Sequence, residues 1–414
     1  MEHGEIIGVE AEVEVRPSVP PPPVWIFSLL VLPTAIYANG FVSTVLTSML
    51  RSEHMSLGNI ANVSALLALP PALYFVWSPM VDFWIRRKTW VALSGILTGL
   101  MLAAALQFPL LGAPGPRLIL FLAMCVSMLT SASLGGLMAA LVPSDQKSRA
   151  GGFYQVGNCG LAALAGGGML YFSQHLPKRE FGILCGLMIA VPGVLALFLK
   201  EAEVVGKHDP FGEVLRLIGV EFKHTFLKWK AVPILLMLGA PFGSGAALNL
   251  LPSLAPDYGM SVDQVAWMNG LGGGLLTALG ALLVGFLKMP DDLRPVYALL
   301  GLGNALTLGI LLLGHPRPVT YLASVTLYMI TIGACYGVFT ALVLKLLGVS
   351  GKSGGSRYAI AVSLGNLPIF YMSVVDGLGA RWFGTKGEPG IDLAVSGIAA
   401  VFALVWFSWE RRRA

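Results

Sequence analysis

The amino-acid sequence predicts an all-α membrane protein with twelve transmembrane helices in two pseudo-symmetric bundles of six. Of its 414 residues, 56% are hydrophobic and 12% are charged, and its mean hydropathy is +0.75. Soluble domains carry about 25% charged residues, so this composition indicates a chain that is surrounded by lipid. Apolar runs long enough to cross a hydrocarbon core of about 30 Å recur along the whole length. One long polar loop divides these runs into six and six.

Helices are the expected form of each span because lipid offers no partner to backbone N–H and C=O groups. An outer-membrane β-barrel would instead show strands of about 10 residues with alternating polarity, a pattern that this sequence does not contain. The twelve expected helices cover residues 24–50, 58–82, 89–110, 118–142, 150–174, 180–199, 231–255, 261–287, 295–314, 318–347, 356–381 and 391–409.

The chain begins with a segment that we expect to be a mobile cytosolic tail, residues 1–22. This segment is rich in glutamate and runs into four consecutive prolines that begin at Pro20. A cleavable signal peptide needs a basic start, and polyproline cannot continue a helix. The two six-helix bundles are then expected at residues 23–199 and 231–414, joined by a cytosolic linker at residues 200–230.

The linker is predicted to contain a helix on the membrane surface. Asp209 and Pro210 suit the cap and the first position of a helix. Apolar residues follow at roughly helical spacing among basic ones, which is typical of a helix at a lipid interface; they are Val214, Leu215, Ile218, Phe222 and Phe226. The alternative is a solvated linker.

The distribution of basic residues predicts that both termini are cytosolic. With that orientation, about three quarters of the 27 lysines and arginines fall in cytosolic segments, as the positive-inside rule requires. The same residues account for the net charge of +5. They are spread over short loops, so they indicate topology and not a nucleic-acid surface. The predicted location is the inner membrane, with many passes.

The two halves of the sequence share a short pattern near the start of the fifth and eleventh expected helices. An internal duplication of a six-helix unit is the simplest cause, and such repeats are typical of membrane transporters. Arginine, glycine and asparagine recur in register, at Arg149, Gly157 and Asn158 and again, 208 residues later, at Arg357, Gly365 and Asn366.

The loop between the second and third expected helices carries a motif that resembles the major facilitator superfamily. That family has an aspartate here, followed four and five residues later by two basic residues. This chain reads Trp77-Ser-Pro-Met-Val-Asp82-Phe-Trp-Ile-Arg86-Arg87-Lys88. Ser78, Phe83 and Ile85 depart from the family pattern. The resemblance implies a secondary transporter that works by alternating access.

Within that superfamily the chain looks most similar to the bacterial muropeptide permeases and the related acetyl-coenzyme A transporters. The resemblance rests on Trp77-Ser-Pro-x-x-Asp82 and on Pro143-x5-Arg149-x-Gly-Gly-Phe-Tyr154. It implies a muropeptide-like or other amphipathic metabolite as the substrate. A ferric siderophore or a drug is the alternative substrate, and a membrane sensor that binds a ligand without transporting it is the alternative function.

The resemblance also implies that Asp82 belongs to a cytosolic gate. Its carboxylate would meet the positive N-terminal end of the eleventh helix, near Ser356 and Arg357. The alternative is a charge that only fixes the topology of a helix end. The expected gating residues are Asp82, Arg86, Arg87, Arg149 and Arg357, and Asp291 and Asp292 are expected to face Arg149.

A second acid, Asp376, lies 19 residues beyond Arg357. At 1.5 Å per residue this places it about 28 Å along the eleventh helix, near the outer surface. A water-exposed carboxylate at a helix end is the expected environment. Asp82 and Asp376 are nevertheless the two candidates for coupling transport to an ion, because the centres of the expected helices hold no Asp, Glu, Lys, Arg or His.

Neutral polar residues occupy the middle of the expected helices and are the candidates for substrate binding. Asn158 and Asn366 lie nine residues beyond their arginines, about 13 Å into the bilayer. The alternative is that such side chains only join neighbouring helices. The full candidate set is Asn39, Tyr154, Gln155, Asn158, Asn249, Tyr336 and Asn366. A polyanionic coenzyme is disfavoured as the substrate, because it would need arginine partners at this depth.

The sequence argues against a membrane enzyme. It holds no intramembrane cluster of histidine and aspartate. We therefore predict no catalytic residue, no cofactor and no metal site. The expected partners are a small-molecule solute and the lipid bilayer, with no nucleic acid, and the chain is expected to act as a monomer.

Overall fold

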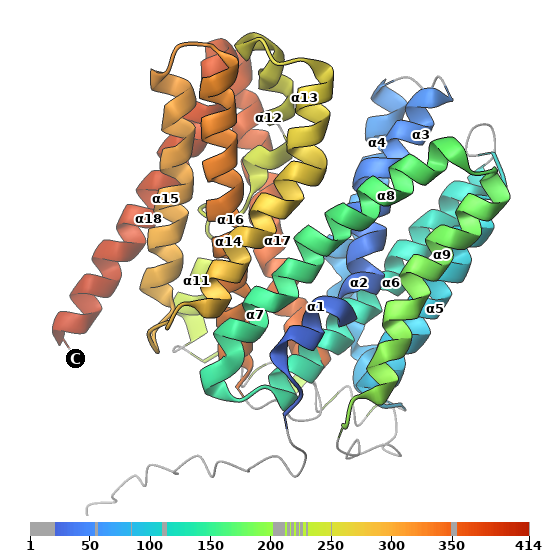
Figure 1. The fold of residues 1–414 in the computed structure, drawn as a ribbon. Helices are drawn as coiled ribbons and strands as arrows, with labels where there is room; N and C mark the ends of the chain where they lie inside the picture. Colours follow the sequence, from blue (N-terminus) through green and yellow to red (C-terminus); the bar gives the residue numbers. More distant parts are fainter. Residues whose placement is uncertain are drawn as a thin grey trace, which may run out of the picture.

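The protein was analysed as a computed structural model, and Figure 1 shows two groups of helices side by side. The described residues are 21–53, 57–83, 85–109, 114–201, 231–249, 251–348 and 354–413, with scattered positions between 212 and 228. Every regular element among them is helical, which confirms the predicted all-α class. Residues 1–20 of the predicted tail and most of the predicted surface helix lie outside the described residues.

The first group of helices contains six passages of the chain. Several passages are built from consecutive short segments, including two π-helical ones, η2 and η6. In order, the elements are η1 (Val24–Ile26), α1 (Phe27–Leu30), α2 (Leu32–Ala35), η2 (Ile36–Leu46) and α3 (Thr47–Ser52); α4 (Leu57–Leu73), η3 (Tyr74–Val76) and η4 (Ser78–Asp82); α5 (Arg87–Ala105); α6 (Pro114–Leu141) and η5 (Ser144–Gln146); α7 (Lys147–Gln155), η6 (Val156–Leu161) and α8 (Ala162–His175); and α9 (Lys178–Val194) with η7 (Leu195–Phe198).

The second group repeats this arrangement with six further passages. Its elements are α11 (Val232–Leu238), η9 (Ala246–Asn249), α12 (Leu251–Leu254) and η10 (Ala255–Tyr258); α13 (Val262–Trp267), η11 (Met268–Gly272) and α14 (Gly273–Phe286); α15 (Arg294–Leu313); α16 (Pro318–Leu347); α17 (Gly354–Phe383) and η12 (Gly384–Lys386); and α18 (Gly387–Arg413). Over the described residues, eight helices are by themselves long and apolar enough to span a membrane. When the passages built from several shorter segments are included, the two predicted bundles of six are present over the described residues.

The seventh expected helix, residues 231–255, is not continuous. Helix α11 ends at Leu238, and the chain turns before η9 begins at Ala246. Gly243 and Gly245 in this turn have φ angles of +69° and +78°, a region that residues with a Cβ atom rarely adopt. The break depends on these two glycines, and an apolar run alone does not reveal it.

Buried apolar side chains form three clusters that follow the division into halves. One cluster lies almost wholly within the first half and a second lies within the second half. The third joins the halves, since it packs Leu134 and Met138 of α6 with Val343 and Leu344 of α16 and with Tyr358 of α17. The two bundles therefore have separate cores and meet through an additional apolar layer.

The glycine pair in the Arg149-x-Gly-Gly motif explains how closely the halves meet. A Cβ atom at Gly151 would lie 2.8 Å from the carbonyl oxygen of Gly337 in α16. A Cβ atom at Gly152 would lie 2.7 Å from the carbonyl oxygen of Ala281 in α14. Helix α7 of the first half therefore packs backbone to backbone against two helices of the second half, as small residues allow.

Candidate functional site

The Asp82 carboxylate lies at one end of the molecule and bridges the two halves. Its Oδ1 accepts a hydrogen bond from the Gly355 backbone N–H at 3.0 Å, and its Oδ2 accepts from Ser356 N–H at 2.8 Å and Ser356 Oγ at 2.6 Å. These N–H groups belong to the first turn of α17, where the helix dipole favours an anion. The predicted contact between Asp82 and the start of this helix is confirmed. We call this end of the molecule the gate end.

Arg87 supports the same carboxylate from the first half. Its Nε and Nη2 donate to Asp82 Oδ1 at 3.1 and 2.9 Å, and the Asp82 side chain is fully buried. The carboxylate of Glu201 in turn accepts from the backbone N–H groups of Arg87 and Lys88 at 3.2 and 3.0 Å. Arg86 is the residue that precedes α5. Asp82 thus accepts hydrogen bonds from three neighbouring residues and is held between the halves.

Lys147 makes a second bridge at the gate end that the sequence analysis did not single out. It is 3% exposed, and its Nζ donates to the carbonyl oxygens of Leu344 and Gly348, each at 2.9 Å. These carbonyls end helix α16, where the helix dipole favours a cation. The gate end therefore joins an anion to a helix N-terminus and a cation to a helix C-terminus, in both cases across the two halves.

Arg149 and Arg357 also lie at this end, but the predicted approach of Asp291 and Asp292 to Arg149 is not seen. Asp292 instead pairs with Arg294 at 2.9 Å, and the Asp291 carbonyl accepts from Lys345. The Arg149 guanidinium lies 5.8 Å from the centre of the Phe286 ring. Arg294 follows Asp292 by only two residues, so it can reach that carboxylate with little loss of chain entropy. Arg357 is buried in the first turn of α17.

A cavity of about 580 Å³ lies between the halves. Six of the seven polar residues predicted for substrate binding line it, and the side chain of the seventh, Asn249, lies outside what the structure describes. The six are Asn39, Tyr154, Gln155, Asn158, Tyr336 and Asn366. The described residues that line the cavity include no charged side chain. The cavity is therefore suited to hydrogen bonding with uncharged groups.

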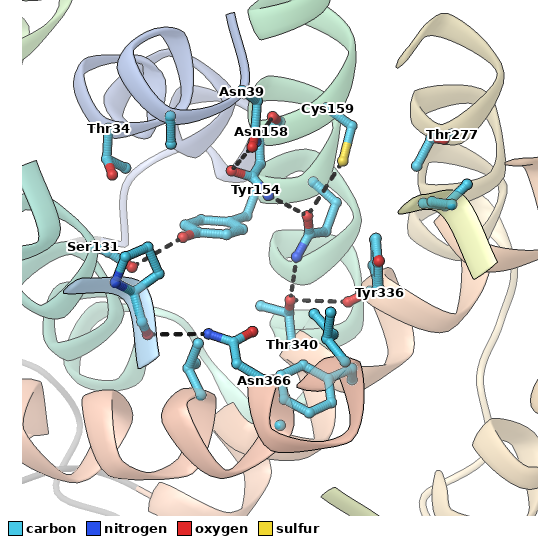
Figure 2. Close-up of a pocket in the computed structure, with 18 of the residues that line it drawn as sticks. Thr34, Asn39, Ser131, Tyr154, Asn158, Cys159, Thr277, Tyr336, Thr340 and Asn366 are labelled. Atoms are coloured by element: carbon cyan, nitrogen blue, oxygen red, sulfur yellow. Dashed lines mark hydrogen bonds between the residues drawn. The ribbon is translucent and has the colours of Figure 1, made fainter. Parts of the chain in front are cut away.

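Figure 2 shows a continuous chain of hydrogen bonds along one wall of this cavity. The Asn39 amide donates to the Asn158 carbonyl at 2.8 Å, and the Asn158 amide donates to Gln155 Oε1 at 2.9 Å. Gln155 Nε2 then donates to Thr340 Oγ1 at 3.0 Å. Because Thr340 belongs to α16, this chain joins the first half to the second.

A second polar link crosses the cavity between α17 and α4. Asn366 Nδ2 donates to the carbonyl oxygen of Pro71 at 3.2 Å, close to the point where α4 gives way to η3. Asn158 and Asn366, which the sequence repeat placed in register, thus both serve as donors in the cavity wall (Figure 2). Among the lining residues, Gln155, Thr340 and Tyr358 are buried whereas Asn39 and Ser43 are exposed.

Several lining residues escaped the sequence analysis. They are small hydroxyl residues and tyrosines in the middle of apolar runs, which no motif distinguishes from packing residues. Those with polar side chains include Thr34, Ser131, Ser244, Thr277, Tyr74, Tyr297 and Tyr358. Their position in a helix was visible, but the face that each presents depends on how the helix packs.

The expectation for Asp376 was wrong. The residue is 0% exposed, and neither carboxylate oxygen has a hydrogen-bond partner among the described residues. Helix α18 packs against α17, with Gly387 of α18 against Gly379, which lies three residues after Asp376. A position near a helix end does not ensure contact with water when another helix covers that end.

We expect Gly245→Ala to destabilise the protein strongly. A Cβ atom at this position would overlap the Tyr336 hydroxyl group, and the positive φ angle adds about 1–2 kcal/mol of backbone strain. Thermal unfolding of the purified protein would measure the loss. Gly303→Ala in α15 is the control, because a Cβ atom there meets nothing within 4 Å. An equal effect of both substitutions would contradict the assignment.

Comparisons with known proteins agree with this geometry. The sequence model of the Major Facilitator Superfamily matches residues 27–371. The fold is similar to that of the proton:xylose symporter XylE bound to 6-bromo-6-deoxy-D-glucose, with a TM-score of 0.69, 14% identity, and 93% of this chain and 95% of that chain covered. It is also similar to the human organic anion transporter MFSD10 (TETRAN), with a TM-score of 0.68, 14% identity, and 92% and 100% covered.

Proposed function

This chain belongs to the major facilitator superfamily of membrane transporters, and we propose that it carries an amphipathic solute rich in hydroxyl and amide groups. The chain is thus a secondary transporter and not an enzyme. The observation that carries the proposal is the lining of the cavity, which combines amides, hydroxyls and aromatic rings from both halves. Its volume of about 580 Å³ lies in the usual range for small-molecule sites.

The hydrogen-bond donors and acceptors that line the cavity determine which polar groups a solute must carry to bind there. Asn39, Asn158 and Asn366 supply amide groups, and Tyr154 and Tyr336 supply rings with hydroxyl groups. A buried polar group that loses water must find a partner, so a hydroxyl-rich or amide-rich solute is favoured over a purely apolar one. A polyanion is disfavoured because the described lining offers it no cation. A muropeptide-like metabolite has suitable groups.

Asp82, Arg87 and Lys147 are proposed to hold the gate end closed, with Arg86, Arg149 and Arg357 as neighbouring basic residues. The bonds to Gly355, Ser356, Leu344 and Gly348 all cross from one half to the other. Rocking the halves apart would break all of them together, while leaving each half's own core intact. We propose that the gate end faces the cytosol of a cell with this protein in its inner membrane, since the basic residues concentrate there.

A ligand panel tests the proposed substrate class. Purified protein in lipid nanodiscs would be heated with a neutral disaccharide, a muropeptide, a coenzyme A thioester, a ferric siderophore and a cationic drug. Only a ligand that binds the folded state raises the unfolding temperature. We expect the disaccharide or the muropeptide to raise it and the thioester to leave it unchanged. Stabilisation by the coenzyme A thioester alone would overturn the proposal.

We expect Asn39→Ala to weaken binding of the stabilising ligand by about tenfold, the value of one hydrogen bond of about 1.4 kcal/mol. The Asn39 side chain donates to Asn158 in its own half, so the gate contacts should not change. Isothermal titration would measure the dissociation constant. Gln107→Ala is the control, since this exposed amide bonds Ala103 within α5's final turns and lies outside the cavity lining. An unchanged constant for Asn39→Ala would remove this residue from the binding site.

A further inference from the structure

Three carboxyl groups are buried together where α17 packs against α18. Asp376 of α17 is 0% exposed, and Glu388 and Asp392 of α18 are 2% and 6% exposed. The sequence analysis singled out Asp376 alone. The three residues interact electrostatically with one another. They lie outside the cavity lining described above.

The close packing of the two helices explains this burial. A Cβ atom at Gly379 would lie 2.6 Å from the carbonyl oxygen of Gly387, so the backbones touch at this level. Asp376 lies one turn before Gly379, and Glu388 directly follows Gly387. The same contact that brings the helices together therefore brings Asp376 and Glu388 out of water.

The carboxyl oxygens lack the partners that buried anions need. Both oxygens of Asp376 and Oε1 of Glu388 have no hydrogen-bond partner among the described residues. Asp392 accepts one hydrogen bond from Ser396 Oγ at 2.8 Å. An unpaired anion in a membrane protein costs several kcal/mol, and adjacent like charges add to that cost. Three ionised carboxylates are therefore not a stable arrangement here.

The surrounding elements do not supply a neutralising cation from the described part of the chain. Lys386 of η12 donates to the Leu312 carbonyl, and Arg381 of α17 is exposed. From α16, the facing titratable group is Tyr328, which interacts electrostatically with Asp376 and Asp392. These neighbours therefore do not neutralise the negative charge of the three carboxylates, and that charge must be reduced in another way.

We propose that Asp376, Glu388 and Asp392 form a proton-binding site of this transporter. A proton adds to a carboxylate oxygen, an O–H bond forms, and the charge of the cluster falls by one. The resulting hydroxyl group can donate to a neighbouring carboxylate, which gives the unpartnered oxygens a bond. The described residues hold no group of His, Cys, Asp and Glu arranged to bind a metal ion.

Asp82, the other candidate for ion coupling, does not suit this role. Both of its oxygens accept hydrogen bonds from N–H and O–H donors. A proton on either oxygen would face those donors and disrupt the gate contact. Asp376, in contrast, presents two oxygens with no partner among the described residues.

The site is linked to the cavity through α16. Tyr328 of α16 faces Asp376 and Asp392, and Tyr336, about two turns further along the same helix, lines the cavity. A single helix thus borders both the carboxyl cluster and the cavity and can couple protonation to solute binding. This consequence rests on the proposed transport function, whereas proton binding itself does not.

Infrared difference spectroscopy of the purified protein in lipid, with no solute present, tests the proposal. The signal is the carbonyl stretch of a protonated carboxyl group, followed while the pH is changed. We expect wild type to show this band on acidification and Asp376→Asn and Glu388→Gln to lose most of it. Glu180→Gln is the matched control, since this exposed acid lies at the start of α9 and its loss should leave the buried band unchanged.

The other possible results of this experiment would contradict the proposal or change the ligand that it names. A wild type without the band, or Asp376→Asn and Glu388→Gln variants that both retain it in full, would overturn the proposal. If sodium or calcium ions removed the band at constant pH, the site would bind a metal cation and not a proton. Because no solute is added, a failure here is distinguishable from a wrong substrate class, which the ligand panel reports separately.

Discussion

Replacing Asp82 with asparagine is expected to open the gate end. The carboxylate accepts hydrogen bonds from Arg87, Gly355 and Ser356. An asparagine keeps one acceptor oxygen but turns an NH₂ group toward the remaining donors. Losing charge-assisted hydrogen bonds of this kind costs about 2 kcal/mol, so the ratio of closed to open molecules should fall by about 30-fold.

Distances between spin labels would measure this shift. Asp145 and Asp291 are exposed and lie near the gate end in opposite halves. We expect the short-distance population to dominate in wild type and a longer distance to dominate in Asp82→Asn. Transport of the ligand found in the panel should slow at least tenfold, while its dissociation constant changes by less than about threefold, because Asp82 does not line the cavity.

Glu201→Gln is the matched control for Asp82→Asn. This carboxylate also bonds next to Arg87, through the backbone N–H groups of Arg87 and Lys88. Both hydrogen bonds join Glu201 to the first half, so the substitution should leave the distances between the spin labels unchanged. The gating role of Asp82 would be refuted by wild-type distances in Asp82→Asn, or by an equal shift in the control.

Gly152→Ala is expected to favour the open gate end without unfolding either half. The new Cβ atom would lie 2.7 Å from the Ala281 carbonyl oxygen and 2.9 Å from the Gly285 Cα atom. These neighbours are backbone atoms of α14, so they cannot turn aside as a side chain can. Overpacking of this kind costs about 1–3 kcal/mol, which would reduce the ratio of closed to open molecules by roughly fivefold to 150-fold.

The same pair of spin labels measures this effect, and the unfolding temperature shows whether the halves stay folded. Gly168→Ala lies in α8 of the same passage, and its Cβ atom would meet nothing within 4 Å. Both substitutions gain the helix propensity of alanine, so their difference isolates the contact with α14. If Gly152→Ala kept the wild-type distances, close packing of α7 would have no part in gating.

The gate contact was predictable because the motif that carries the family resemblance is local. The spacing from Asp82 to the two arginines lies within one loop, and the start of the eleventh helix follows from the hydrophobic pattern. Lys147 was not predictable in the same way. A lysine near a helix start usually remains in water, and its contact with the Leu344 and Gly348 carbonyls depends on where α16 of the other half ends.

The cavity was predictable to a similar extent. Depth along a helix follows from counting residues, which is why Gln155, Asn158 and Asn366 were expected at mid-depth and do line the cavity. Thr34, Ser131 and Thr277 also line it, yet hydroxyl residues in apolar runs are equally common in helix packing. The choice between these two environments depends on the rotation of each helix about its axis.

The sequence by itself determined that the chain crosses the membrane many times in two related halves, because hydropathy and charge act on each segment separately. It also determined the residue types available at each depth. The tertiary structure alone decided that Asp376 is buried beside Glu388 and Asp392 and that the seventh passage breaks at Gly243 and Gly245. Burial depends on which helix covers a residue, and that is a property of packing between segments far apart in the sequence.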